Sequence, residues 1–369
     1  MNPFRYGQVV GRAFYCPRND LEKLLVEKFS SSQNVLVRGE RRTGKTSLIL
    51  HAIDSAKGRR SLYVDLLEVK TVDDVYKRFL DAIVRFESKA QFLQAALKKM
   101  ASLRPVMTFD SITGLPSISV DSSIEFKPDS LGALLDLLRD NSFSSAVAVI
   151  DEFQDILNLK DSAQALAIMR STIQFLDKVP FVFCGSILNR MDSIFNDHRS
   201  PFFKSAQTVS VGPIDHATFR DFIRRRFESV RMKVTPEVLE KIFSIAGENP
   251  GDIQQICSAF YDIADKECSI DETKISEALA YIFAQEQKGY ETCLAQVTAL
   301  QLKCLTAVAR LGGRGVFGRE FLTRTGIRQP STVRKSLQRL LDLKILFMVN
   351  GEYRFVNPYF AKWLVWRNF

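Results

Sequence analysis

The sequence predicts an α/β domain with a mainly parallel five-stranded sheet, then an all-helical region and a small domain of helices and one hairpin. Three observations predict this order. Short apolar runs first alternate with helical patterns. Helical patterns then continue without strands, and the chain closes with helices and two short strands around an Asn-Gly turn signal. The expected parts are residues 1–213, 214–289 and 290–369.

A glycine-bounded loop follows the first expected strand. Residues 39–46, GERRTGKT, match the pattern G-x-x-x-x-G-K-[ST] between an apolar run and a helical pattern. This context is typical of a phosphate-binding loop. Glycines let several backbone N–H groups point at one anion, and the helix N-terminus adds its positive dipole end. The expected nucleotide ligands are Gly39, Glu40, Arg41, Arg42, Thr43, Gly44, Lys45, Thr46 and Ser47.

Four residues of this region and of a later strand end have distinct expected roles. Lys45 supplies a point charge for the β- and γ-phosphates, and the Thr46 hydroxyl is a ligand for Mg²⁺. Asp151 and Glu152 directly follow an apolar strand, residues 146–150. We expect Asp151 to hold hydrated Mg²⁺ and Glu152 to orient and polarise the attacking water. The predicted class is a P-loop NTPase. We expect an ATPase that binds ATP or ADP and hydrolyses ATP slowly; these residues alone do not exclude guanine nucleotides, although no Asn-Lys-x-Asp guanine signature is present.

An insertion interrupts the α/β pattern at about residues 105–128. It carries alternating apolar residues on both sides of a Thr-Gly-Leu-Pro turn signal, which predicts a β-hairpin. The sequence does not indicate a function for this hairpin. A second glycine pattern, residues 313–318, matches G-x-G-x-x-G but follows a helix, so we interpret it as an inter-helix loop.

Composition favours a folded protein outside the membrane. Hydrophobic residues make up 46% of the 369 residues, enough for a large core. No apolar run has the length of a membrane span, and the N-terminal sequence MNPFRYGQVV does not resemble a signal peptide. The six cysteines are scattered without a C-x-x-C pair, which favours reduced, buried thiols. A cytoplasmic protein is therefore expected.

The net charge of +9 is concentrated at the end of the chain. Residues 290–369 carry 13 Lys and Arg against 4 Asp and Glu, which accounts for the whole excess. Double-stranded DNA, bound mainly through its phosphates, is one expected partner. A basic face used for protein contacts or autoinhibition is the alternative. The last helices and the hairpin have the order of a winged helix, whose expected recognition helix is residues 330–343. The candidate DNA contacts lie on this helix, just before it and on the hairpin that forms the wing: Arg328, Arg334, Lys335, Arg339 and Arg354.

These motifs together resemble the archaeal-type ATPases, which belong to the STAND branch of the AAA+ proteins. The resemblance is carried by Asn2-Pro3-Phe4 and Arg18, by the phosphate loop and acidic strand, and by later motifs. These later motifs are Cys184-Gly185-Ser186, Gly247-Glu248-Asn249-Pro250, Phe355-Val356-Asn357-Pro358 and Trp363. The likeness extends over essentially the whole chain. It implies an AAA+-like α/β domain, a helical lid and a winged helix.

The resemblance also implies roles for particular residues. Phe4 to Val10 and Arg18 would pack near the adenine, and Pro250 would mark a lid position that reports the nucleotide state. Ser186 would contact the γ-phosphate or the attacking water; a simple Gly-Ser turn is the alternative. Family members are thought to be switches that open or assemble with ATP, so a nucleotide-dependent homo-oligomer is expected. Lys204-Ser205 stands where the family often has Gly-Arg, so an arginine finger has no clear counterpart here.

Three functions fit these features. The first is a Mg²⁺-dependent ATPase switch that acts on DNA, similar to replication-initiator or transposition ATPases. The second is a signalling or defence ATPase whose winged helix binds protein. The third is a nucleotide-binding scaffold with negligible hydrolysis, which the acidic pair Asp151-Glu152 argues against because binding alone does not need the second acid.

Overall fold

The computed structural model describes residues 1–87, 105–109, 116–120, 128–186, 188–264, 269–349 and 351–369. The chain forms two compact units. The sheet unit is Gly11–Gly212, and the helical unit combines Met1–Val10 with Pro213–Phe369. The chain therefore passes from one unit to the other twice, after Val10 and after Gly212.

The sheet unit contains the expected five-stranded sheet. The order is β2-β5-β6-β1-β7, and each neighbouring pair is parallel. Parallel pairing places all five carboxyl ends at the same edge of the sheet, where ligands bind in open α/β folds. The strands are β1 (Val35–Arg38), β2 (Arg60–Asp65), β5 (Ala146–Asp151), β6 (Phe181–Gly185) and β7 (Gln207–Ser210).

The three inner strands, β1, β5 and β6, bury apolar side chains on both faces of the sheet, whereas the edge strands β2 and β7 bury them on one face. Along β5, Val147 and Val149 enter one core cluster, while Ala148 and Ile150 enter the other. This follows from the two-residue alternation of a strand, and it explains why the strands read as unbroken apolar runs. Helices must therefore cover both faces.

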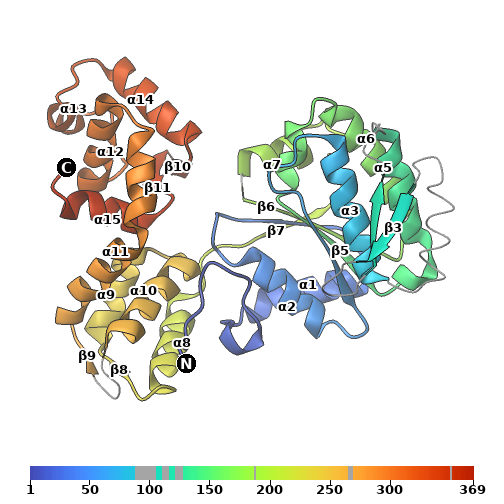
Figure 1. The fold of residues 1–369 in the computed structure, drawn as a ribbon, viewed down its shortest axis with the longest axis horizontal. Helices are drawn as coiled ribbons and strands as arrows, with labels where there is room; N and C mark the ends of the chain where they lie inside the picture. Colours follow the sequence, from blue (N-terminus) through green and yellow to red (C-terminus); the bar gives the residue numbers. More distant parts are fainter. Residues whose placement is uncertain (88–104, 110–115, 121–127, 187, 265–268, 350) are drawn as a thin grey trace. The chain divides into compact units, whose positions relative to one another are not determined.

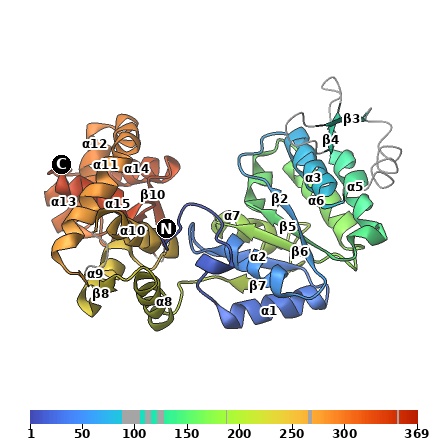
Figure 2. The ribbon, with the colours of Figure 1, turned by 60° about the horizontal axis from the view of Figure 1, so that its bottom comes forward.

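Helices cover both faces of the sheet (Figures 1 and 2). The first face packs on α1 and α2, which supply Leu25, Phe29, Leu48 and Ile49 to its cluster. The second face packs on α3, α5, α6 and α7. These helices are α1 (Asn19–Ser30), α2 (Lys45–Ser55), α3 (Val72–Phe86), α5 (Pro128–Leu135), α6 (Ser162–Ile173) and α7 (Leu188–Phe195).

The inserted hairpin is confirmed in its strands. β3 (Pro105–Phe109) pairs antiparallel with β4 (Pro116–Val120). The expected turn between them and the alternating residues after β4 lie outside the described residues.

The helical unit begins with a small group of helices. They are α8 (His216–Glu228), α9 (Pro236–Ala246), α10 (Pro250–Ile263) and α11 (Thr273–Ala295). A short parallel pair, β8 (Lys233–Val234) and β9 (Ser269–Ile270), joins this group and was not expected from the sequence. Side-chain caps start three of these helices, since Asp215, Thr235 and Asn249 accept backbone N–H groups in the first turns.

The winged helix follows in the same unit and confirms the sequence expectation. Its elements are α12 (Ala299–Leu311), α13 (Arg319–Thr325), α14 (Pro330–Asp342), β10 (Leu346–Val349) and β11 (Glu352–Phe355). Helix α15 (Pro358–Trp366) closes the chain and buries Trp363 against Tyr290 of α11. The sequence analysis did not predict α15 as a helix. Residues 289 and 290 both lie within α11, so one continuous helix joins the two helical groups.

The N-terminal segment belongs to the helical unit. Phe4 is buried against Phe227 of α8, with ring centroids 4.6 Å apart. The Asn2 side chain donates to the Ser258 hydroxyl at 2.8 Å and to Asp262 at 3.0 Å, both on α10. The first residues of the chain are thus held by helices that follow more than 200 residues later.

We predict that Phe153→Ala destabilises the sheet unit by about 3–5 kcal/mol. Phe153 is 0% exposed and packs against Phe183, Phe195 and Phe202, with centroids 4.8–5.9 Å apart. The measurement is the free energy of unfolding in denaturant. Phe175→Ala, at a site 62% exposed, is the control and should change it by less than about 0.5 kcal/mol. Equal stability of the two variants would contradict the central role of this aromatic cluster.

Candidate nucleotide-binding site

The phosphate loop connects the end of β1 to the start of α2. Gly44 is the N-cap of α2 and has φ of +83°, a conformation that glycine adopts without a Cβ penalty. Gly39 opens the loop beside the strand end β7. A Cβ at Gly39 would lie 2.4 Å from the Val211 carbonyl oxygen, so only glycine allows this close approach. The two motif glycines therefore have separate structural reasons.

Lys45 lies inside the loop and is buried. Its ammonium group donates to the carbonyl oxygens of Gly39 at 3.0 Å and Glu40 at 2.9 Å. Thr43 is also buried, and its hydroxyl donates to the Glu40 carbonyl at 3.1 Å. The backbone of the loop thus surrounds the Lys45 ammonium group. This positive charge lies at the start of α2, where it is needed to bind phosphates.

The other loop residues face different surroundings. Arg41 and Arg42 are exposed, whereas Ser47 is buried in the first turn of α2. Arg42 has φ of +111°, which is unfavourable for a residue with a Cβ. Such backbone strain is concentrated at ligand-binding loops.

The carboxylate of Asp151 is the meeting point of three elements. Its Oδ2 accepts from the Thr46 hydroxyl at 2.7 Å and from the Tyr63 hydroxyl at 2.8 Å. Its Oδ1 accepts from the Glu152 backbone N–H at 2.9 Å. Thr46 comes from α2, Tyr63 from β2 and Glu152 follows β5. Both oxygens of this buried carboxylate are therefore hydrogen-bonded.

Two groups next to Asp151 have raised pKa values. Partial burial raises the pKa of the Tyr63 phenol, and the negative charge of Asp151 raises it further. Full burial raises the pKa of the Cys184 thiol, to which Asp151 also contributes. Both groups stay protonated at neutral pH, so Tyr63 acts as a hydrogen-bond donor to Asp151.

Glu152 stands in a strained conformation between two donors. It has φ of +47°, in the left-handed region. Its Oε2 accepts from the Gln154 side-chain amide at 2.5 Å and from the Ser186 hydroxyl at 3.0 Å. Gln154 is only 1% exposed, and a Cβ at Gly185 would lie 2.3 Å from its Oε1. The glutamate head group is therefore held by its neighbours.

Strand order explains how Ser186 reaches Glu152. β6 lies between β1, which leads into the phosphate loop, and β5, which leads into Asp151 and Glu152. A residue directly after β6 therefore lies between the two motifs. The structure brings together the sequence-predicted Lys45, Thr46, Asp151, Glu152 and Ser186 in this way.

The oxygen atoms of Thr46 and Asp151 at the carboxyl edge of the sheet are suitable ligands for a magnesium ion. Mg²⁺ is usually bound by one or two protein oxygens, with waters and substrate phosphates completing its shell. The Thr46 hydroxyl and the Asp151 carboxylate, 2.7 Å apart, are such a pair. Within the described ranges, no group of three or more His, Cys, Asp and Glu could hold a metal by itself. This donor set therefore suits a metal that arrives with a nucleotide.

Arg18 links the phosphate loop to the end of the sheet unit. Its guanidinium donates to the Thr43 carbonyl at 2.7 Å and to the Gly212 carbonyl at 2.6 Å. Burial lowers the pKa of this guanidinium, but it remains charged. Phe4, Val10 and Pro250 belong to the helical unit. The roles of these four residues toward adenine or the lid stay predictions.

The candidate DNA contacts are exposed on the winged helix. Arg334 and Lys335 lie in α14, and the Arg334 guanidinium stacks 5.3 Å from the ring centroid of Phe317. Arg354 of β11 pairs with Glu352 at 2.9 Å, so part of its charge is neutralised. Arg328 and Arg339 are exposed as well.

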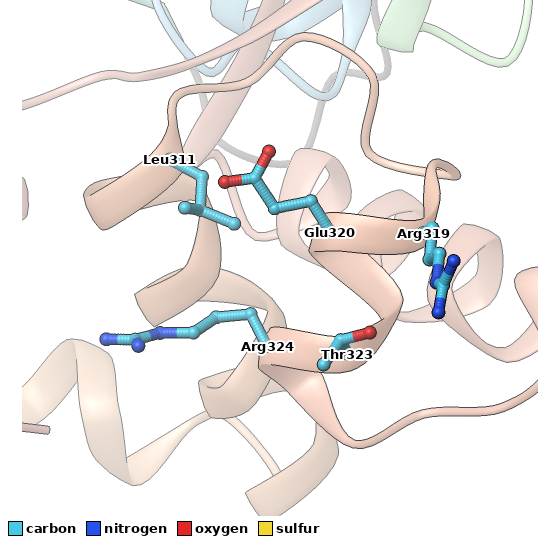
Figure 3. A pocket seen from close by; sticks show the side chains of 5 residues that line it. All are labelled: Leu311, Arg319, Glu320, Thr323 and Arg324. Carbon is cyan, nitrogen blue, oxygen red and sulfur yellow. The ribbon is translucent and has the colours of Figure 1, made fainter.

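A hollow of about 540 Å³ lies nearby on the same domain (Figure 3). Leu311, Arg319, Glu320, Thr323 and Arg324 line it. Figure 3 shows the side chains of Arg319 and Arg324 extending in opposite directions and the Glu320 carboxylate beside Leu311, so the two positive charges do not converge on one ligand. We assign it no ligand.

The glycine pattern at residues 313–318 is a loop between α12 and α13, as expected. A Cβ at Gly313 would lie 1.7 Å from the Tyr353 carbonyl oxygen, and the Tyr353 N–H donates to the Gly313 carbonyl at 3.1 Å. Gly313 therefore allows the loop to pack on the wing strand, which is a structural role.

Sequence analysis missed two residues of the site, Tyr63 and Gln154. Gln154 lies two positions after Glu152, and this closeness in sequence to the acidic pair was the available signal. Tyr63 gave no signal, because its contact depends on the pairing of β2 with β5.

The fold and this arrangement define a P-loop ATPase with an AAA+-like sheet and a C-terminal winged helix. The chain belongs to the family described as ATPase domain predominantly from Archaea, whose model matches residues 19–256. The model of a probable winged helix domain matches residues 288–366. No curated protein sequence matches the chain significantly.

Solved structures share the fold at low sequence identity. The Walker-type ATPase PABY2304 of Pyrococcus abyssi has a TM-score of 0.65 and 18% identity, covering 96% of this chain and 97% of its own. The Aeropyrum pernix ORC2 protein, in ADPNP-ADP complexes, has a TM-score of 0.54 and 14% identity, covering 99% of each chain. The Aeropyrum pernix ORC1 protein, in complex with DNA, has a TM-score of 0.51 and 17% identity, covering 96% and 95%.

We predict that Gln154→Met lowers ATP turnover by roughly ten- to a hundredfold while ATP affinity changes less than about twofold. Methionine keeps the buried volume, but it cannot donate to Glu152, so the carboxylate loses its fixed position. Steady-state turnover and calorimetric ATP binding measure the two quantities. Turnover at the wild-type rate would show that Gln154 does not position Glu152.

Proposed function

We propose that the protein is a Mg²⁺-dependent ATPase whose nucleotide state controls the relation between its two units. The observation that carries this proposal is the set of hydrogen bonds at the carboxyl edge of the sheet. Asp151 is fixed beside Thr46, and Glu152 is fixed beside Ser186, next to a lysine already in the phosphate loop. Binding alone would not require the second acid, so this arrangement favours hydrolysis.

Each residue has a defined part in the proposed reaction. The loop N–H groups and Lys45 bind the β- and γ-phosphates, and Thr46 with Asp151 would hold the metal. Mg²⁺ would neutralise charge on the phosphates and fix their orientation. Glu152 accepts a hydrogen bond from the attacking water and polarises it, and Ser186 lies where it could contact the same water or the γ-phosphate. A slow rate is expected, as for a switch.

The contacts of Arg18 support coupling between the nucleotide and the helical unit. One side of its guanidinium holds the phosphate loop at Thr43, and the other holds Gly212, the last residue of the sheet unit. A conformational change in the phosphate loop would therefore act on Gly212, where the chain leaves the sheet unit. Val211 packs against Gly39 of the same loop, which supports the same route.

A second function, double-stranded DNA binding, is favoured by the charge of the winged helix. The basic excess of the chain lies in residues 290–369, and α14 exposes Arg334, Lys335 and Arg339. A similar fold has been solved in complex with DNA, the Aeropyrum pernix ORC1 protein. We propose that DNA is the partner of this surface. Protein binding, as in a STAND-type signalling or defence ATPase, is the alternative outcome.

The remaining proposals concern assembly and location. A nucleotide-dependent homo-oligomer is also proposed. Arg199 and Lys204 are the basic residues at or near the position where the family often has Gly-Arg. Arg199 pairs with Asp197 at 3.0 Å, and Lys204 lies over the ring of Phe203. Neither supplies an evident finger. In the part of the chain that the structure describes, no helix combines the length and apolarity of a membrane span. A cytoplasmic location stays a prediction.

Two variants should separate binding from hydrolysis. Lys45→Ala should weaken ATP binding by about a hundredfold or more, because a buried charge that faces the phosphates is lost. Glu152→Gln should keep ATP affinity within about twofold but lower turnover by roughly a hundredfold or more. Calorimetry and phosphate release measure the two effects. Unchanged affinity of the first variant would refute the loop assignment, and unchanged turnover of the second would remove Glu152 from the reaction.

DNA binding should depend steeply on salt. Replacing Arg334 and Lys335 together by Ala should weaken duplex binding roughly tenfold or more and lower the salt slope by about two, since two phosphate contacts are lost. Fluorescence anisotropy at several salt concentrations measures both quantities. Lys303→Ala combined with Lys362→Ala removes two exposed charges from other helices of the domain and is the matched control. Equal effects of the two double variants would favour the protein-binding alternative.

A further inference from the structure

Tyr63 reaches Asp151 from the edge strand of the sheet. In the pairing of β2 with β5, Tyr63 lies opposite Val149, two residues before Asp151. Two residues of a strand span about 6.5 Å, which is also about the length of a tyrosine side chain from its Cα to its hydroxyl. The side chain must therefore lean along the sheet toward its carboxyl edge, and its hydroxyl ends 2.8 Å from Asp151 Oδ2.

The face of the sheet explains why Tyr63 and Thr46 meet. Tyr63 is paired with Val149, which belongs to the core cluster under α1 and α2. Thr46 lies in the first turn of α2, so both hydroxyls approach the carboxylate from the same side of the sheet. Tyr63 is 38% exposed, which leaves its ring at the margin of the site and its hydroxyl inside it.

The hydroxyl groups of Thr46 and Tyr63, which both donate to Asp151, differ in their relation to the phosphate loop and the metal. Thr46 belongs to the phosphate loop and helix, where it would also hold the metal. Tyr63 belongs to a different element, and its hydroxyl contacts the carboxylate without being part of the loop. With the Glu152 N–H on Oδ1, it can keep the Asp151 carboxylate in one orientation whether or not the loop holds a nucleotide.

We propose that Tyr63 is a positioning residue that holds the metal-binding carboxylate of Asp151. This inference rests on the proposed function, because it deepens the description of the same magnesium site. Outer residues that hydrogen-bond a metal ligand fix its orientation, and their loss usually weakens metal binding by ten- to a hundredfold. Tyr63 makes no direct contact with nucleotide in this role, so its effect is confined to the metal.

The test compares Tyr63→Phe with the wild-type protein in two measurements of binding. Calorimetry of ADP with excess Mg²⁺ and with EDTA gives the part of nucleotide affinity that depends on the metal. Electron paramagnetic resonance of Mn²⁺ in the presence of saturating ADP gives metal affinity directly. We expect Tyr63→Phe to weaken Mn²⁺ binding roughly tenfold and to leave ADP affinity in EDTA within about twofold.

Ser61→Ala is the matched control. Ser61 lies two residues earlier on the same strand and face, and its buried hydroxyl has no hydrogen-bond partner among the described residues. Its removal should leave Mn²⁺ affinity within about twofold. A double-mutant cycle with Asp151→Asn separates a direct effect from a general one. In that background Tyr63→Phe should have no further effect on Mn²⁺ binding.

The outcomes distinguish this inference from the proposed function. Metal-dependent ADP binding by the wild-type protein, together with Mn²⁺ affinity unchanged in Tyr63→Phe, would overturn the role of Tyr63 alone. A tenfold loss that persists in the Asp151→Asn background would overturn it too, because the effect would not pass through Asp151. A wild-type protein whose nucleotide binding does not respond to Mg²⁺ would overturn the proposed function and this inference together.

Discussion

The carboxylate of Asp151 is the interaction on which the arrangement of the site depends. It accepts hydrogen bonds from the first turn of α2, from the edge strand β2 and from the backbone after β5. A buried carboxylate without such donors would be costly, so the three elements must meet at this point when the sheet forms. The phosphate loop is thereby fixed relative to the acid that would share its metal. Fold stability and the geometry of the proposed metal site have the same physical origin.

The adjacent Glu152 combines an unfavourable backbone conformation with a fixed position of its carboxylate. Its left-handed backbone is unfavourable for a residue with a side chain, yet it directs the carboxylate toward Gln154 and Ser186. The aromatic cluster around Phe153 holds the next residue firmly in the core, so packing can offset that local strain. The chain thus places the Glu152 carboxylate at the carboxyl edge of the sheet and limits its freedom through contacts with Gln154 and Ser186.

The helical unit carries the basic surface for which a partner is proposed. The N-terminal segment, the helices α8 to α11 and the winged helix are one compact unit, and α11 joins the two helical groups without a break. A Glu286 carboxylate on α11 accepts from Gln255 of α10 and from Asn357 at the start of α15. These hydrogen bonds connect α10, α11 and α15 within the helical unit.

The sequence by itself determined the order of the sheet strands and of most helices, the phosphate loop and the two acids at the end of β5. Glycine spacing, apolar runs and the Asn-Gly signal are local features, so residues such as Gly44, Lys45 and Asp151 could be recognised without a structure. Only the tertiary structure decided which groups surround them. Tyr63 meets Asp151 because β2 pairs with β5, and Ser186 meets Glu152 because β6 lies between the two motif strands. Helix α15 was missed because its start at Pro358 follows a strand so closely, and the packing of Trp363 on Tyr290 stabilises it. Periodicity reports the local conformation of the backbone, whereas pairing between distant strands is set by packing across the whole sheet.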